Sequence, residues 1–134
     1  MATRAVEKLQ HAQTLTLTPN ANIAEGKPVK YGSSDTTCVA AGAGEMPIGW
    51  TETALLSGVP GTVIISGGIK EVNVDASGAT RGKSQVIGSG GGIQDAPTAG
   101  GGTTAYNCVG FAVQSGSSGD KVGLLIHPHV ILAA

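Results

Sequence analysis

Short runs of alternating apolar and polar residues recur along the chain, separated by clusters of Gly, Ser, Asn and Asp. Alternation with a period of two is typical of half-buried strands, and these runs are rich in Thr, Val and Ile. The pattern predicts an all-β domain with short strands at residues 14–18, 28–31, 37–40, 48–56, 62–66, 70–74, 85–87, 107–114 and 121–127, and a further one at 130–132. Two Gly-rich stretches, 88–92 and 98–104, are expected to form exposed loops.

An internal repeat divides this pattern into two similar units. The motif GKxxxxGS occurs at residues 26–33 and again at 82–89. Ile48-Gly49-Trp50 likewise matches Val109-Gly110-Phe111, and each is followed by a Gly-rich turn and an apolar strand. We therefore expect two half-units, at about residues 24–70 and 80–131, which bury their apolar faces by stacking into a β-sandwich or closed barrel.

The aromatic residue of each unit is a candidate anchor. A Gly directly before Trp50 or Phe111 lets another backbone approach the strand while the ring beside it fills space. We interpret both rings as core anchors, with an interface hot spot as the sharper interpretation of Trp50.

The N-terminal stretch has a different pattern. Ala2, Ala5, Val6 and Leu9 have the i, i+3, i+4, i+7 spacing of a helix, but the stripe is too short to be stable alone. We interpret residues 1–13 as an arm that orders against a partner, or otherwise as a frayed end, and residues 14–134 as a single β domain.

Composition favours a role inside an assembly. Only 13% of the residues are charged and the formal net charge is −1, so much of the surface is neutral and an oligomer, most simply a trimer, is expected. Eight basic residues beside nine acidic ones provide no positive stripe for nucleic acid. The sequence contains no run of 18 apolar residues, which would predict a membrane span, and no recognisable export signal. Synthesis in the cytoplasm is therefore expected.

Candidate chemistry is sparse. Without an export signal, Cys38 and Cys108 are expected to be unpaired and structural, although one disulfide is possible in principle. His127-Pro128-His129 places two imidazoles on one strand face, yet two ligands do not make a metal site, so an edge or interface segment is the preferred interpretation. No nucleophile motif or phosphate-binding loop is present. The sequence therefore predicts no enzyme, metal or cofactor.

The order of several motifs resembles a known family. GxxV near residue 26, Gly44-Glu45-Met46-Pro47-Ile48-Gly49, a GxxGxV hairpin, the element at 108–113 and a terminal strand at 119–122 together resemble the head decoration, or capsid cement, proteins of tailed phages. The resemblance covers about residues 14–127 and implies a compact β-domain that trimerises on the outer surface of the capsid. It would bind the major capsid protein and stabilise the head against packaged DNA.

Under this interpretation the arm contacts the capsid through Arg4, Val6 and Leu9. The tail after residue 127 extends past the expected last strand of the family. A different class remains open, a carbohydrate-binding or adhesin-like β-sandwich on a virion or cell surface. Such a module would need exposed aromatic rings, for which the candidates are Trp50, Tyr31, Tyr106 and Phe111.

Overall fold

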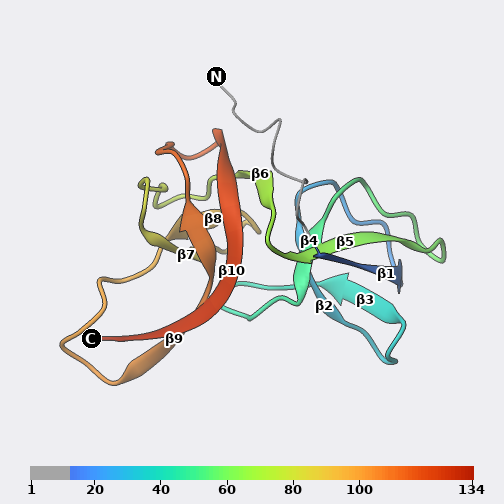
Figure 1. Cartoon of the computed structure of the whole chain (residues 1–134), viewed down its shortest axis with the longest axis horizontal. Coiled ribbons are helices and arrows are strands. Elements are labelled where there is room, and N and C mark those ends of the chain that lie inside the picture. The colour runs from blue at the N-terminus through green and yellow to red at the C-terminus, as the bar shows by residue number, and fades with distance from the viewer. Residues whose placement is uncertain (1–12) are drawn as a thin grey trace.

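The computed structural model describes residues 13–134, which form ten strands and no helix. The strands are β1 (Gln13–Pro19), β2 (Pro28–Tyr31), β3 (Thr37–Ala40), β4 (Gly49–Thr51), β5 (Gly61–Ser66), β6 (Ile69–Asn73), β7 (Ser84–Ile87), β8 (Ile93–Asp95), β9 (Thr104–Ala112) and β10 (Lys121–Ala133). Figure 1 shows β1–β5 on one side and β6–β10 on the other. The predicted all-β fold class is confirmed.

The two halves have the same topology. β1–β5 form a closed barrel in the order β1-β3-β2-β4-β5, and β6–β10 form a sheet in the order β6-β10-β9-β7-β8. When β6 is matched to β1, β7 to β2 and onwards, every strand pair of the second sheet has an equivalent pair in the barrel. The parallel pairing of β1 with β3 closes the barrel, and its counterpart in the second half is a single parallel bridge between Val74 and Ile93. The second half is therefore a nearly closed copy of the first.

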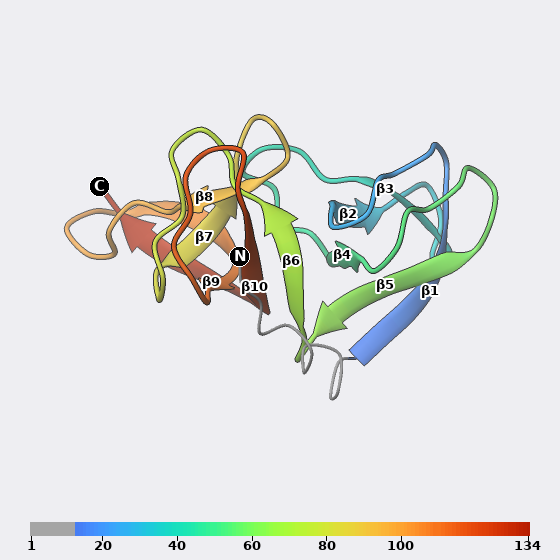
Figure 2. The ribbon, with the colours of Figure 1, turned by 90° about the horizontal axis from the view of Figure 1, so that it is seen from above.

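The prediction of two similar half-units is confirmed. The first half-unit is a closed barrel. In the structure each half starts with a strand that precedes the expected half-unit bounds, β1 before residue 24 and β6 before residue 80. Figure 2 shows β6 between the barrel and the rest of the second sheet, directly after β5 in the chain. The connection from β5 to β6 thus carries the chain from one half to the other.

Several strands differ from the sequence prediction. β4 covers only residues 49–51 of the expected 48–56, and β8 lies where only a segment between two loops was expected. The expected strands at 121–127 and 130–132 are one strand, β10, which runs through Pro128. The register between β10 and β9 shifts between Ile126 and His129. Such a bulge accommodates a proline because the extra residue makes no ladder hydrogen bond.

The core has a separate cluster inside the barrel and a larger one between the two halves. The barrel interior holds Leu17, Ile23, Val29, Cys38, Leu55 and Val63. On β4 and β5 the paired residues Trp50 and Ile64 belong to the larger cluster, whose other members come mostly from the second sheet. Because neighbouring side chains on a strand point to opposite faces, Thr51 and Val63 face into the barrel while Trp50 and Ile64 face the second half. Burial of this shared cluster joins the halves into one unit.

Candidate interaction surfaces

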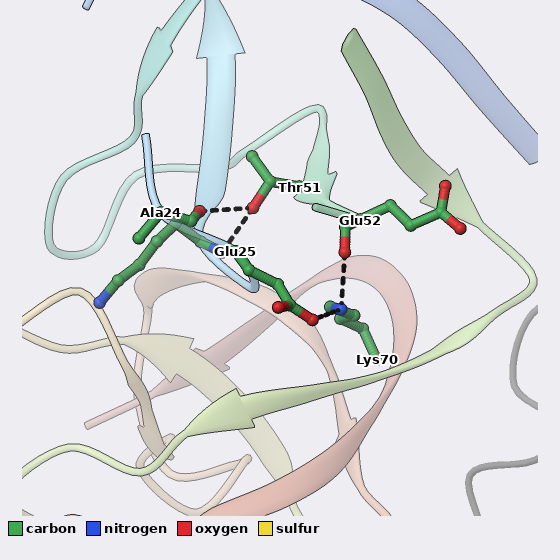
Figure 3. A network of polar contacts seen from close by, with 6 residues as sticks. Ala24, Glu25, Thr51, Glu52 and Lys70 are labelled. Atoms are coloured by element: carbon green, nitrogen blue, oxygen red, sulfur yellow. Dashed lines mark hydrogen bonds and ion pairs between the residues drawn. The ribbon is translucent and has the colours of Figure 1, made fainter. Parts of the chain in front are cut away.

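A polar network pins the barrel to β6. The Lys70 side chain is only 4% exposed, and its ammonium group donates to the Glu25 carboxylate at 2.7 Å and to the backbone oxygen of Glu52 at 2.9 Å (Figure 3). The Thr51 hydroxyl donates to the Ala24 carbonyl oxygen and accepts from the Lys27 backbone N–H. A buried ammonium needs such partners, because an unpaired one loses its hydration without compensation. The β1–β2 connection is therefore held against β6.

Gly26 fits closely into the same junction. Its backbone has φ +72°, and a Cβ at this position would lie 3.0 Å from the Glu71 carbonyl oxygen on β6. Glycine provides both the positive φ and the space. The repeated GKxxxxGS motif thus begins, in the first half, at the point where that half contacts the second.

A cavity of about 340 Å³ lies beside this junction. Its walls come from the β1–β2 connection, from residues 40–43 at the end of β3 and directly after it, and from the glycine-rich connection between β7 and β8 at residues 88–91. Most of the lining residues are glycine or alanine, and Lys27 is the only charged residue among them. The cavity is thus a hollow left by small side chains where the two halves meet.

Three rings stack on the outer face of the second sheet. The Phe111 ring on β9 lies with its centroid 4.8 Å from that of His129 and 5.7 Å from that of His127, both on β10. The His129 ring contacts Ser84 Oγ through Nε2 at 2.9 Å and the His127 carbonyl oxygen through Nδ1 at 2.7 Å. Because a carbonyl only accepts, Nδ1 carries a proton in this contact, and Nε2 faces the Ser84 hydroxyl. This arrangement fixes the orientation of the His129 ring.

The ring stack does not complete a metal site. Between residues 13 and 134 the structure contains no group of three or more His, Cys, Asp or Glu side chains that could hold a metal ion. Both nitrogens of His129 already have partners within the chain.

Residues 13–134 include no helix long and apolar enough to cross a membrane.

The C-terminal part of β10 exposes apolar side chains. Val130 is 56% exposed and Leu132 52% exposed, on the opposite face of the strand from Ile131, which packs with Tyr106 against a small cluster of Val86, Ala96 and Cys108. Leu125, nearer the start of β10, is 38% exposed and lies opposite Phe111. An exposed row of large aliphatic side chains on one strand is typical of a surface that a partner covers.

Two carboxylates have lowered pKa values. Burial acts to raise the pKa of the Asp95 carboxyl, but hydrogen bonds from Thr80 and Gln85 outweigh it and hold the pKa below its usual range. The pKa of the exposed Glu45 carboxyl is lowered by its contact with Lys30 and by the Gly42 backbone N–H. Both carboxylates hold loops in place.

The two cysteines are free and buried, one in the barrel cluster and the other in the cluster around Tyr106. Burial raises the pKa of both thiols. A buried protonated thiol is a poor nucleophile, so the cysteines have the character of structural apolar residues.

The structure places the residues singled out from the sequence in different environments. Trp50 is 1% exposed in the cluster shared by the halves. Phe111 lies outside the core clusters, half-buried in the ring stack, which differs from the expected core position. The physical reason is that Phe111 pairs with Ser84 and Leu125 on the outer face, whereas Val109 and Ala112 point inward. Arg4, Val6 and Leu9 lie outside the described residues.

Lys27 and Lys70 were not singled out from the sequence. Lys70 follows an apolar residue at the start of an alternating strand, a pattern that predicts a solvated side chain, and only the packing of the barrel against β6 buries it. Lys27 belongs to the recognised GKxxxxGS motif. The repetition of this motif indicated two similar halves, but it did not indicate that a cavity lies between them.

Comparison with known proteins identified a fold. The sequence matches no protein-family model and no curated protein at a significant level. Among solved structures, the chain is similar to the crystal structure of the head fiber gp8.5 N base of bacteriophage phi29, with a TM-score of 0.62 and 18% sequence identity. The likeness covers 87% of this chain and 94% of that one. The chain therefore shares the fold of the phi29 head fiber base.

Proposed function

We propose that this protein is a structural protein of a phage head, which binds the outer surface of the capsid and stabilises it against the pressure of packaged DNA. The observation that carries the proposal is the shared fold with a head fiber base over nearly all of that chain. The order of motifs that resembles the capsid decoration proteins supports it independently, because it was read from the sequence alone.

Attachment would combine several weak contacts. Val130, Leu132 and the ring stack around Phe111 offer apolar area on β9 and β10, and a second copy of this chain, in a trimer, would cover part of it. Residues 1–13 would contribute Arg4, Val6 and Leu9 to the major capsid protein. Each contact contributes little, but repetition over many identical capsid positions provides a large combined stabilisation. Such a role needs no metal, cofactor or nucleic acid.

The test is retention on purified heads. We expect the protein to co-sediment with DNA-filled heads and to raise the temperature at which they release DNA. A Val130→Asp/Leu132→Asp variant should lose retention or form monomers in light scattering, because charges would be desolvated in the contact. Val59→Asp is the matched control, since Val59 is 51% exposed on the loop between β4 and β5.

Contradiction would come from a protein that stays in the supernatant with DNA-filled heads. Selective binding in a glycan screen would instead support an adhesin-like module. If heads carrying the protein show fibres but release DNA at an unchanged temperature, the protein is a fibre attachment base and the stabilising role is wrong.

A further inference from the structure

The cavity between the two halves has the features of a site for a single carboxylate. It has a volume of about 340 Å³ and is lined mostly by alanine and glycine, with Asn22 and Ser89 as polar residues and Lys27 as the only charged residue that the described part of the chain contributes. We propose that it receives an Asp or Glu side chain from the protein surface to which this chain attaches. The inference rests on the proposed function, which it deepens by giving the chemistry of the partner.

The Lys27 ammonium group is available to a ligand. Two ion pairs occur within residues 13–134, Lys30 with Glu45 and Lys70 with Glu25, and neither involves Lys27. The Lys27 side chain is half-buried, and its backbone N–H is already used by the Thr51 hydroxyl. A partly desolvated ammonium without a carboxylate partner binds an anion more strongly than a fully solvated one does.

The glycine-rich wall keeps the space beside this ammonium open. A Cβ on Gly91 would lie 3.6 Å from Lys27 Nζ, so a side chain at this position would occupy space beside the ammonium group. The loop is held by the Asp75 carboxylate, which accepts a hydrogen bond from the backbone N–H of Gly90. The same carboxylate also accepts from the backbone N–H of Ala76. Asp75 is therefore satisfied by backbone donors, whereas residues 13–134 provide no hydrogen-bond or ion-pair partner for the Lys27 ammonium group.

A carboxylate fits better than a phosphate of nucleic acid. The cavity offers one positive charge, and the whole chain has a net charge of −1, whereas binding to a nucleic-acid backbone depends on several cations that neutralise successive phosphates. Alanine residues 24, 40, 41 and 43 also line the cavity and would contact the aliphatic part of an Asp or Glu side chain. A protein segment with an exposed Asp or Glu provides both the carboxylate and the aliphatic part.

The direct test uses the peptide N-acetyl-Ala-Asp-Ala-amide and its Asn counterpart with the ¹⁵N-labelled full chain. At about 10 mM peptide, where a ligand of millimolar Kd is partly bound, we expect amide shifts at residues 40–43 and 88–91 with the Asp peptide. The Asn peptide should bind at least about tenfold more weakly. Lys27→Met should abolish the shifts and Lys27→Arg should retain them, whereas Lys83→Met, at the equivalent position of the second half, should have no effect.

Retention on heads separates this inference from the proposed function. We expect Lys27→Met to weaken retention about tenfold, and the deficit to shrink as salt screens the wild-type contact. Heads that retain Lys27→Met as well as the wild type would overturn the carboxylate site and leave the proposed function standing. Asp-peptide shifts at residues 88–91 without any retention on heads would overturn the proposed function and leave the carboxylate site standing. An equal response to the Asp and Asn peptides would overturn the carboxylate assignment.

Discussion

Gly49 and Gly110 occupy equivalent positions in the two halves and meet equivalent atoms. A Cβ on Gly49 would collide with the backbone oxygen of Ile64, and one on Gly110 would collide with that of Leu125. In each half this carbonyl belongs to the residue that pairs with the aromatic ring following the glycine, Ile64 with Trp50 and Leu125 with Phe111. The repeated glycine is thus required by the close approach of two strands.

Gly49→Ala and Gly110→Ala should therefore each destabilise the protein by about 2–4 kcal/mol, because neither neighbouring backbone can move without breaking its ladder. Urea unfolding measures the change. Gly58→Ala is the control: Gly58 has φ +77° but open space around it, so we expect only the conformational cost of about 1–2 kcal/mol. A Gly110 variant no less stable than the Gly58 variant would contradict the close approach.

Trp50→Ala and Phe111→Ala should differ in their effects. Trp50 is enclosed by the cluster between the halves, so its removal leaves a cavity and should cost about 3–5 kcal/mol. Phe111 is half-buried against two histidine rings, and its loss should cost only about 1–2 kcal/mol. Thermal unfolding of the two variants checks this order, and equal losses would show that Phe111 is a core residue after all.

The Lys70 network predicts an asymmetry between its partners. Lys70→Met keeps the buried aliphatic stem and removes the charge, so the loss should stay within about 1.5 kcal/mol. Glu25→Gln leaves the buried ammonium without its carboxylate and should cost about 1–3 kcal/mol. Chemical unfolding of both single variants and the double variant gives their coupling. No coupling between the two positions would mean that the contact contributes nothing to stability.

Stability should fall in acid partly through Asp95. Its pKa is lowered in the folded state, so the ionised form stabilises the fold above the unfolded pKa of about 3.9. This contribution is lost as the pH falls from there through the lower folded pKa. The free energy of unfolding of Asp95→Asn should therefore decline less than that of the wild type between about pH 4.5 and about pH 2.5, a range that brackets this unfolded pKa. An unchanged decline would assign the acid sensitivity to other groups.

The buried thiols should be protected from reagents. Cys38 and Cys108 are both 0% exposed and have raised pKa values, so a disulfide reagent should label neither in the folded protein at neutral pH. Both should react after unfolding in urea. Rapid labelling of Cys108 alone in the native protein would mean that the contact between β9 and β10 opens easily.

Much of the fold could be predicted from the sequence because its signals are local. β2 and β3 have the expected bounds, since alternation and β-branched residues act within a few positions. The GKxxxxGS repeat and the paired glycine–aromatic elements indicated two similar halves, because each glycine must recur wherever the same backbone geometry recurs. β8 was missed because three residues between glycine-rich loops carry too little periodicity.

Only the tertiary structure determines the contacts and the burial between the two halves. The same glycine–aromatic motif buries Trp50 and leaves Phe111 half-exposed, because the shared cluster lies on the inner face of β9 while Phe111 points outward. The burial of Lys70 and the opening beside Lys27 both depend on how the barrel meets β6 and the β7–β8 loop. These contacts join residues far apart in the chain, and their geometry follows from packing, which no local pattern of side chains encodes.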